Sequence, residues 1–394
     1  MKKTLLWIGA LVVGAIFGLL GQDWLNGLMD FVATVYTRLF QLLAVPTIVL
    51  AVITTFATFG SKGSGRIFGH TLIYTLLTTF AAAAVGALLY VVVVPGNLPA
   101  EAISNTQPSV LSPQTSFYDH VLSVIPNNIV KPFLEGNVLS LLLLAFAVGI
   151  GLSKLPENEN KAAVVKGLLG LQDLLFLLIR GLIWTLPLGI LAFSAQLSAQ
   201  VSAGVVVDSI GKYVLVVLGG NVIQFFIILP LFLMVRGLNP IHVMGRMMPA
   251  LLMALFTKSS AATLPVTMES AEQRLGVRKD IARFVLPICT TINMNGCAAF
   301  ILVTSLFVMQ NGGTPLTLGT ILLWILISVV SAIGNAGVPM GCFFLTLSLM
   351  SGIGAPVAIL GIILPIYTII DMVETAENVW SDSCVCAMTD HDLK

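Results

Sequence analysis

Long apolar stretches separated by short polar segments make up most of this chain. A stretch of about 20 apolar residues is long enough to cross the hydrocarbon core of a bilayer as a helix. Eight such stretches lie near residues 4–21, 24–60, 68–94, 119–153, 165–197, 207–235, 284–310 and 355–386. The pattern therefore predicts an all-α polytopic membrane protein with eight transmembrane helices.

Lys and Arg residues are unevenly distributed among the polar segments. They form five clusters, at residues 2–3, 62–66, 154–166, 236–246 and 274–283, whereas segments 95–118, 195–208 and 311–320 contain none. Because cytoplasmic loops are enriched in basic residues, the five clusters are predicted to be cytoplasmic and the three bare segments exterior. Both termini are then cytoplasmic, and residues 95–118 form an exterior loop.

Two further stretches must begin and end on the same side of the membrane under this topology. Residues 247–272 lie between two cytoplasmic clusters, with the small and polar TKSSAAT (257–263) at the tip. Residues 318–352 must begin and end outside, and their middle, GNAGVPMG (334–341), contains Gly and Pro where a helix cannot continue. Two re-entrant hairpins of opposite orientation form an inverted repeat, which is typical of secondary transporters.

The last stretch carries polar residues in its C-terminal half. Asp371, Glu374, Thr375, Asn378 and Asp382 follow one another at helical spacing and share one face. Ionisable groups inside a membrane are costly, so such a face indicates a substrate or ion pathway rather than a polar seam between helices. Asp371 suits an ammonium group, and Asp382 suits a hard cation that needs oxygen ligands. Glu377 falls outside this face.

Two other motifs suit ligands. TKSSAAT provides the hydroxyls of Ser259 and Ser260 and free backbone N–H groups at a broken helix end, which favour a substrate carboxylate. A simple polar turn is the alternative. In TTINMNG (290–296), Asn293 and unwound backbone carbonyls would suit a dehydrated Na⁺, although Asn and Thr also join helices by hydrogen bonds. The adjacent Thr78 and Thr79 of the third stretch are open to the same two interpretations.

Composition excludes several classes of protein. Only 9% of the residues are charged, whereas soluble domains have about 25%. The net charge of +1, without a basic run, gives nucleic-acid binding no support. No Walker A motif supports an ATP-driven pump, and no nucleophile–base pair supports an enzyme. The five cysteines (289, 297, 342, 384 and 386) lie within or beside apolar segments and are predicted to be packing residues rather than disulfide partners.

Four motifs in order, TKSSAATLPVT, TINMNG, AGVPMG and DMVETAENVWSD, resemble the dicarboxylate/amino acid:cation symporter family, also known as the glutamate transporter family. The resemblance covers nearly the whole chain. It implies a homotrimer in the inner membrane with an elevator mechanism. Residues 1–67 and 119–206 would form the static scaffold, and residues 68–94 and 207–394 the mobile transport domain.

The resemblance also implies roles for individual residues. The substrate α-carboxylate would be held by Ser260 with its neighbouring backbone and by Asn378, the amino group by Asp371 and Thr375, and Val338 would close the site. One Na⁺ would be held by Asn293, Asp382 and the Asn378 carbonyl, a second by carbonyls near Ala332, Ile333 and Asn335, and a third by Thr78, Thr79 and Asn293.

Three departures from the family pattern bear on the substrate. Glu374 stands where members that carry acidic substrates have an Arg, Cys297 where they have a Thr, and Asn295 where they have an Asp in the sodium motif of the seventh span. A charged Glu374 beside a substrate carboxylate would place like charges together in a low dielectric. Asn295 in place of this Asp weakens the predicted third Na⁺ site.

The ETA motif in the eighth span resembles the bacterial serine/threonine:sodium symporter branch. This resemblance therefore implies Na⁺-coupled uptake of a small neutral amino acid. Uptake of a cationic amino acid or cystine, uptake of an acidic substrate with Glu374 protonated, and H⁺ coupling remain alternatives. A passive anion channel is the alternative from another class, and Glu374 could pair with Lys258 instead of substrate.

Overall fold

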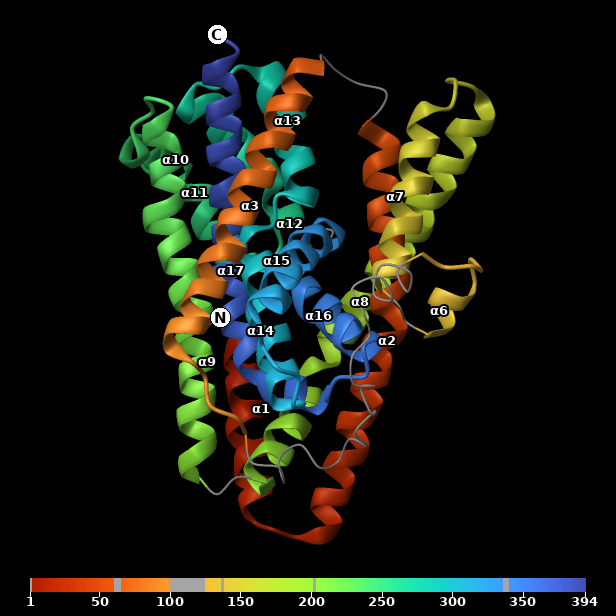
Figure 1. Ribbon diagram of the computed structural model, residues 1–394, viewed down its shortest axis with the longest axis vertical. Helices are drawn as coiled ribbons and strands as arrows, with labels where there is room; N and C mark the ends of the chain where they lie inside the picture. The colour runs from red at the N-terminus through yellow and green to blue at the C-terminus, as the bar shows by residue number, and fades with distance from the viewer. Residues whose placement is uncertain (1, 60–64, 99–124, 136–137, 201–202, 336–339) are drawn as a thin grey trace.

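The computed structural model describes residues 2–59, 65–98, 125–135, 138–200, 203–335 and 340–394 (Figure 1). Within these ranges every regular element is helical. The N-terminal half contains α1 (Lys2–Leu19), α2 (Asp23–Phe59), α3 (Gly65–Val93), α6 (Lys131–Glu135), α7 (Val138–Lys154) and α8 (Glu159–Gln200). It continues with α9 (Ala203–Ile223), the π-helix η1 (Gln224–Ile228), α10 (Leu229–Val235), α11 (Pro240–Thr257), α12 (Ser260–Glu269) and the π-helix η2 (Ser270–Leu275). The last third contains α13 (Lys279–Ile292), α14 (Asn295–Asn311), α15 (Leu318–Ala332), the 3₁₀-helix η3 (Ile333–Asn335), α16 (Gly341–Gly352) and α17 (Ala358–Asp392).

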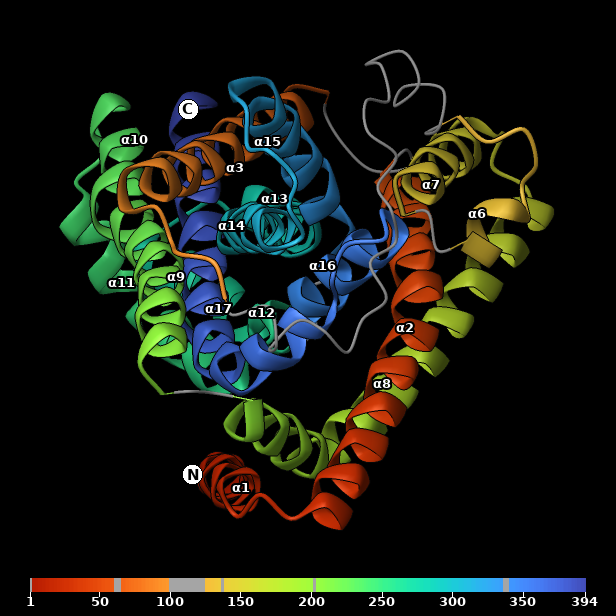
Figure 2. The same cartoon turned by 60° about the horizontal axis from the view of Figure 1, so that its bottom comes forward.

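The helices form two groups (Figures 1 and 2). In one group α8 packs along α1 and α2, and α2 also packs against α7. In the other, α14 lies at the centre and contacts α3, α9, α15, α16 and α17, so that residues 295–309 are all buried. The two groups meet where α16 contacts α2 and α17 contacts α8.

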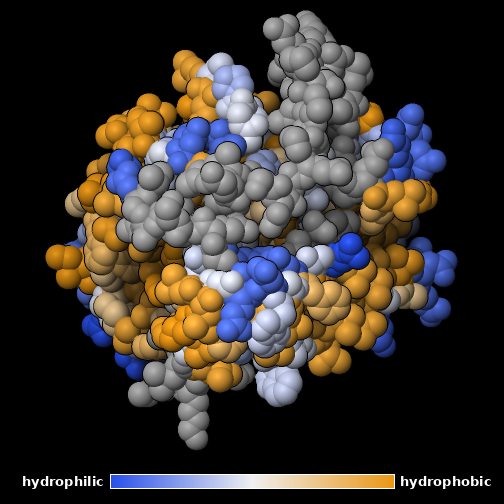
Figure 3. Space-filling view, turned by 90° about the horizontal axis from the view of Figure 1, so that it is seen from below, coloured by the Kyte–Doolittle hydropathy of each residue, from blue (hydrophilic) through white to orange (hydrophobic). Residues whose placement is uncertain are grey.

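Six helical segments in the described ranges are long and apolar enough to cross a membrane. They are Gly65–Val93, Glu159–Ile179, Asp208–Val235, Pro240–Thr257, Lys279–Asn311 and Ala358–Asp392. Large apolar side chains are exposed along Gly65–Val93, Glu159–Ile179, Asp208–Val235 and Pro240–Thr257, whereas Lys279–Asn311 is buried among other helices. Figure 3, which looks onto one end of the molecule, shows hydrophobic residues around much of its rim. These features support a polytopic membrane protein. Pro240–Thr257 is long enough to span by itself, although the basic clusters predict that it is one arm of a hairpin.

Two helix pairs occupy the positions of the predicted hairpins. The helix α11 ends at Thr257, Lys258 adopts a left-handed conformation (φ 54°), and α12 then packs back against α11. In the second pair, α15 and α16 both pack against α14, and Met340 is left-handed (φ 62°) just before α16. Both turns fall within the motifs in which the sequence predicts helix breaks, although residues 336–339 lie outside the described ranges.

The seventh apolar stretch is broken in its middle. The helix α13 ends at Ile292, α14 begins at Asn295, and neither Asn293 nor Met294 has helical backbone angles (ψ 73° and 70°). The predicted unwinding at TTINMNG is therefore present. The fourth apolar stretch is also discontinuous, as the IPNN segment (125–128) predicts, because residues 125–130 are not helical and the short α6 precedes the long helix α7, which begins at Val138. The Pro and Asn residues of this segment account for the non-helical residues 125–130.

Candidate functional site

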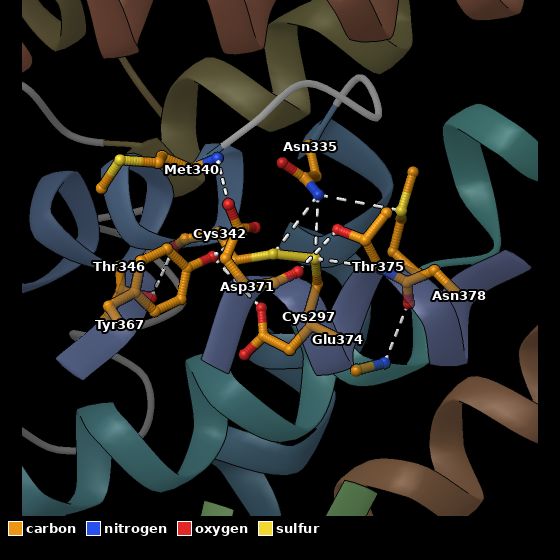
Figure 4. The surroundings of a disulfide bond; sticks show 12 residues. Cys297, Asn335, Met340, Cys342, Thr346, Tyr367, Asp371, Glu374, Thr375 and Asn378 are labelled. Carbon is orange, nitrogen blue, oxygen red and sulfur yellow. Dashed lines mark hydrogen bonds between the residues drawn. A yellow bond between two sulfur atoms is a disulfide. The ribbon is translucent and has the colours of Figure 1, made fainter. Parts of the chain in front are cut away.

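A small cavity lies where the tip of the first helix pair meets α17, the start of α14 and the start of α16 (Figure 4). The residues that line it come from sequence positions more than 100 residues apart. They are Lys258, Ser260, Met294, Cys297, Asn335, Cys342, Asp371, Glu374, Thr375 and Asn378. Six of the residues predicted to bind substrate therefore share one cavity.

Two buried carboxyl groups, Asp371 and Glu374, form one wall of the cavity. The Tyr367 hydroxyl lies 3.1 Å from Glu374 Oε2, to which it donates, and 3.4 Å from Asp371 Oδ1. The Met340 backbone N–H donates to Asp371 Oδ2 at 3.2 Å. Within the described part of the chain Glu374 Oε1 is buried and has no hydrogen-bond partner. The wall thus offers an acceptor oxygen to a ligand.

Two further side chains, Tyr367 and Lys258, interact with this wall and were not predicted as ligands. Tyr367 precedes Asp371 by four residues and Glu374 by seven, so helical spacing alone places it on the same face. The Lys258 ammonium lines the cavity and acts electrostatically on Asp371. The cavity therefore combines two acidic groups with one basic group.

The opposite side of the cavity presents a helix N-terminus. Ser260 is the first residue of α12 and lines the cavity, whereas the Ser259 hydroxyl caps this helix by accepting from the Ala262 N–H at 3.1 Å. Asn378 Oδ1 accepts from the Gly296 N–H at 2.9 Å. Thr375 donates to the Asp371 carbonyl of its own helix at 2.7 Å. The backbone N–H groups and the helix dipole at the N-terminus of a helix suit an anionic group such as a carboxylate.

Cys297 and Cys342 form a disulfide in this cavity, joining α14 to α16 (Figure 4). The prediction that all five cysteines are packing residues is wrong for these two, while Cys289, Cys384 and Cys386 are free and buried. The partners are 45 residues apart in sequence, and only the packing of α16 on α14 brings them together. Asn335 Nδ2 donates to the two sulfur atoms at 2.8 and 3.3 Å.

A second polar cluster lies where the break between α13 and α14 meets α3 and α17. Asn293 Nδ2 donates to Asp382 Oδ1 at 2.9 Å, and Asn293 Oδ1 accepts from the Thr78 hydroxyl at 3.2 Å. Asn295 Oδ1 accepts from the Thr79 hydroxyl at 2.9 Å. All five side chains are buried. The structure thus brings together the side chains predicted for two of the three Na⁺ sites.

Ser381 belongs to this cluster and was not predicted. Its hydroxyl oxygen accepts from Asn293 Nδ2 at 2.9 Å and from Asn295 Nδ2 at 2.8 Å. Because it directly precedes Asp382, adjacency to a predicted ligand was the signal in the sequence. A buried carboxylate next to amide and hydroxyl side chains, without a basic partner in the described part of the chain, offers oxygen ligands that suit a hard monovalent cation.

The residues predicted for the second Na⁺ site, and Val338, are not all found at the cavity. Asn335 lines the cavity, but Ala332, at the end of α15, and Ile333, at the start of η3, do not. Val338 lies outside the described residues.

Comparison with known proteins agrees with the resemblance. A model of the sodium:dicarboxylate symporter family matches residues 4–392. The neutral amino acid transporter B(0) of Oryctolagus cuniculus is 30% identical over 391 residues, which cover 90% of this chain and 72% of that protein. The neutral amino acid transporter A of Homo sapiens is 28% identical, with coverage of 92% and 76%. The excitatory amino acid transporter 2 of Rattus norvegicus is 27% identical, with coverage of 90% and 72%.

Proposed function

Since the chain belongs to the sodium:dicarboxylate symporter family, we propose that it couples Na⁺ influx to the uptake of a small neutral amino acid such as serine or threonine. Such a protein is a transporter and not an enzyme. The observation that carries the substrate class is the Glu374 carboxyl, whose Oε1 atom is buried in the cavity wall without a hydrogen-bond partner among the described residues. A substrate hydroxyl would donate to this atom.

The cavity has groups for both ends of an amino acid. The α-amino group would lie at Asp371, where the carboxyl and Thr375 are available. The α-carboxylate would lie between the N-terminus of α12 at Ser260 and the Asn378 amide, with Val338 closing over it. Cys297 and Ser259 would border the substrate. The α-amino and α-carboxylate groups are common to all amino acids, so selectivity must come from the residue that contacts the substrate side chain.

Glu374 sets that selectivity by charge. Two like unit charges about 4 Å apart repel by about 4 kcal/mol at an effective dielectric constant of about 20. A substrate with a side-chain carboxylate would meet this repulsion, and a neutral hydroxyl would not. Relatives named as neutral amino acid transporters are consistent with this choice.

The cation cluster would bind the Na⁺ that drives uptake. Asp382 and Asn293 with the Asn378 carbonyl would hold one ion, and Thr78, Thr79, Asn293 and Asn295 a weaker one. Carbonyls near Ala332, Ile333 and Asn335 would hold another. Because Asn378 lines the substrate cavity and its carbonyl would bind the cation, cation binding would order the substrate site.

The same proposal includes the architecture of the working protein. Eight transmembrane helices and two re-entrant hairpins would place the chain in the inner membrane with both termini cytoplasmic. Residues 1–67 and 119–206 would form a trimeric scaffold, against which residues 68–94 and 207–394 move as an elevator. The separate packing of α1, α2, α7 and α8 supports this division.

A second candidate substrate is a cationic amino acid. It is favoured by the two carboxyl groups in one cavity, Asp371 for the α-amino group and Glu374 for a positively charged side chain. Here the attraction between Glu374 and the substrate replaces the hydrogen bond to a hydroxyl.

Uptake of radiolabelled serine into proteoliposomes, with every other amino acid as competitor, tests the proposal. We expect threonine to compete, aspartate and glutamate not to compete, and uptake to stop without a Na⁺ gradient. Stronger competition by lysine than by threonine would establish the cationic alternative. Competition by aspartate alone would refute the role of Glu374. Uptake driven by a proton gradient without Na⁺ would refute Na⁺ coupling, and flux that never becomes concentrative would indicate a channel.

A further inference from the structure

The disulfide between Cys297 and Cys342 lies inside the substrate cavity, and no step of the proposed function uses this bond. Both cysteines line the cavity, and their exposed fractions are only 1% and 2%. A Glu374 carboxyl oxygen and the two sulfur atoms all lie within 4.8 Å of one another (Figure 4). The bond is therefore next to the residue to which substrate selectivity is assigned.

The bond joins the starts of two helices that form the cavity wall. Cys297 lies in the first turn of α14, which is buried as far as Met309. Cys342 lies in the first turn of α16. The Met340 N–H, which donates to Asp371 Oδ2 at 3.2 Å, also holds this end of α16. A substrate ammonium at Asp371 would compete for that hydrogen bond, but an ammonium or hydroxyl group does not displace a covalent S–S bond.

The cavity is too small for an amino acid while the bond is intact. The centre of a water-sized sphere can occupy about 10 Å³ of it, which is room for about one water molecule. The walls must therefore move apart before serine binds. The helix α14 packs against α3, α9, α15 and α17 of its own group, whereas α16 also contacts α2 and α7 of the other group. Movement between the two groups would thus release α16 rather than α14, and the disulfide opposes this.

The sulfur atoms also occupy amide donors and provide no donor of their own. Asn335 Nδ2 donates to both of them, and Asn378 Nδ2 donates to Cys297 Sγ at 3.6 Å. Asn378 is the amide assigned to the substrate carboxylate. Two buried acceptors at the cavity, Asn335 Oδ1 and Glu374 Oε1, have no partner among the described residues. Reduction of the disulfide would supply two S–H donors to this region.

We propose that Cys297 and Cys342 form a reversible thiol–disulfide switch, in which the disulfide excludes substrate and reduction by a small thiol admits it. A thiolate of the reductant attacks one sulfur atom, breaks the S–S bond and releases the other cysteine as a thiol. A second thiol then breaks the mixed disulfide. The two cysteines gain two electrons and two protons, and the reductant leaves as its own disulfide. The inference rests on the proposed function, because the switch controls entry of the same substrate.

Alkylation of the purified protein tests the switch without requiring transport. The native protein is treated with copper phenanthroline or with dithiothreitol, then unfolded, alkylated with N-ethylmaleimide and weighed by mass spectrometry. After oxidation we expect label on the three free cysteines, Cys289, Cys384 and Cys386, and after reduction on all five. Five labels after oxidation, or three after reduction of the native protein, overturns the proposal.

Hydrogen–deuterium exchange tests whether reduction releases α16. In the wild type we expect dithiothreitol to raise the exchange rate of backbone amides in residues 341–352 about 10-fold, because local opening of this helix becomes more frequent. In Cys342→Ala the rate should be the same in dithiothreitol and in copper phenanthroline. An unchanged rate in the reduced wild type overturns the proposal.

Uptake tests whether release of α16 admits substrate. In proteoliposomes with a Na⁺ gradient, we expect the reduced wild type to take up serine at least about 10-fold faster than the oxidised wild type, because only the competent fraction binds. Cys342→Ala, or Cys342→Ser if the first variant does not fold, should have one rate under both conditions. The matched control Cys386→Ala removes a free buried cysteine and should respond like the wild type.

Equal uptake by the oxidised and reduced wild type, or a redox response in Cys342→Ala, overturns the proposal. If the wild type takes up no amino acid in either state, the proposed function fails. The alkylation and exchange results then still decide whether the disulfide is a switch that controls α16.

Discussion

Replacing Glu374 with Arg should change the substrate class from neutral to acidic amino acids. The Glu374 side chain lines the cavity, with Oε2 bonded to Tyr367 at 3.1 Å and Oε1 available to substrate. A substrate hydroxyl bonded to Oε1 forms a charge-assisted hydrogen bond, which contributes roughly 1.5–3 kcal/mol. Its loss in Glu374→Arg should weaken serine binding about 10- to 100-fold, since 1.4 kcal/mol corresponds to a factor of 10.

Aspartate should gain in the same variant. The repulsion of about 4 kcal/mol between Glu374 and a substrate carboxylate about 4 Å away would be replaced by an attraction of similar size. Because part of this gain is offset by desolvation of the new ion pair, we expect about 2–4 kcal/mol, or about 30- to 1,000-fold tighter aspartate binding.

The assay is a competition series in proteoliposomes, with radiolabelled serine for the wild type and radiolabelled aspartate for Glu374→Arg. Glu374→Gln separates the two effects, because its amide oxygen still accepts a hydrogen bond but carries no charge. Glu159→Arg makes the same change in charge at an exposed position outside the cavity and should leave selectivity unaltered. Equal inhibition of Glu374→Arg by serine and aspartate would refute the assignment of Glu374 as the selectivity position.

Three further substitutions test the packing and the cation cluster. Gly296→Ala should lower stability by about 1–3 kcal/mol, because its Cβ would lie 2.9 Å from α17 backbone, whereas Gly219→Ala, with its nearest contact at 3.6 Å, should be neutral in thermal unfolding. Asp382→Asn removes the charge that would balance a bound cation, so the Na⁺ concentration for half-maximal uptake should rise at least about 10-fold; an unchanged Na⁺ dependence would contradict the site. Ser381→Ala leaves two amide donors without their shared acceptor and should weaken Na⁺ dependence about 5- to 10-fold, whereas Ser383→Ala, whose hydroxyl bonds only within α17, should not.

Much of the architecture was accessible from sequence because it follows from local physics. Apolar length indicates membrane helices, Gly and Pro interrupt them, and a polar face at helical spacing indicates a buried polar pathway. The breaks at Lys258 and at Asn293 lie within the predicted motifs, and Asp371, Glu374 and Asn378 share a cavity. Each of these features depends on residues within one or two helical turns of each other.

Only the tertiary structure decided which distant residues meet. The disulfide between Cys297 and Cys342 and the place of Ser381 between two asparagines both depend on how separate helices pack. The sequence places Glu377 outside the polar face of α17. If only that face of the helix were buried, Glu377 would be exposed to solvent or lipid. From Glu374 to Asp390, however, every residue of α17 is buried, so neighbouring helices rather than helical periodicity determine what each side chain contacts.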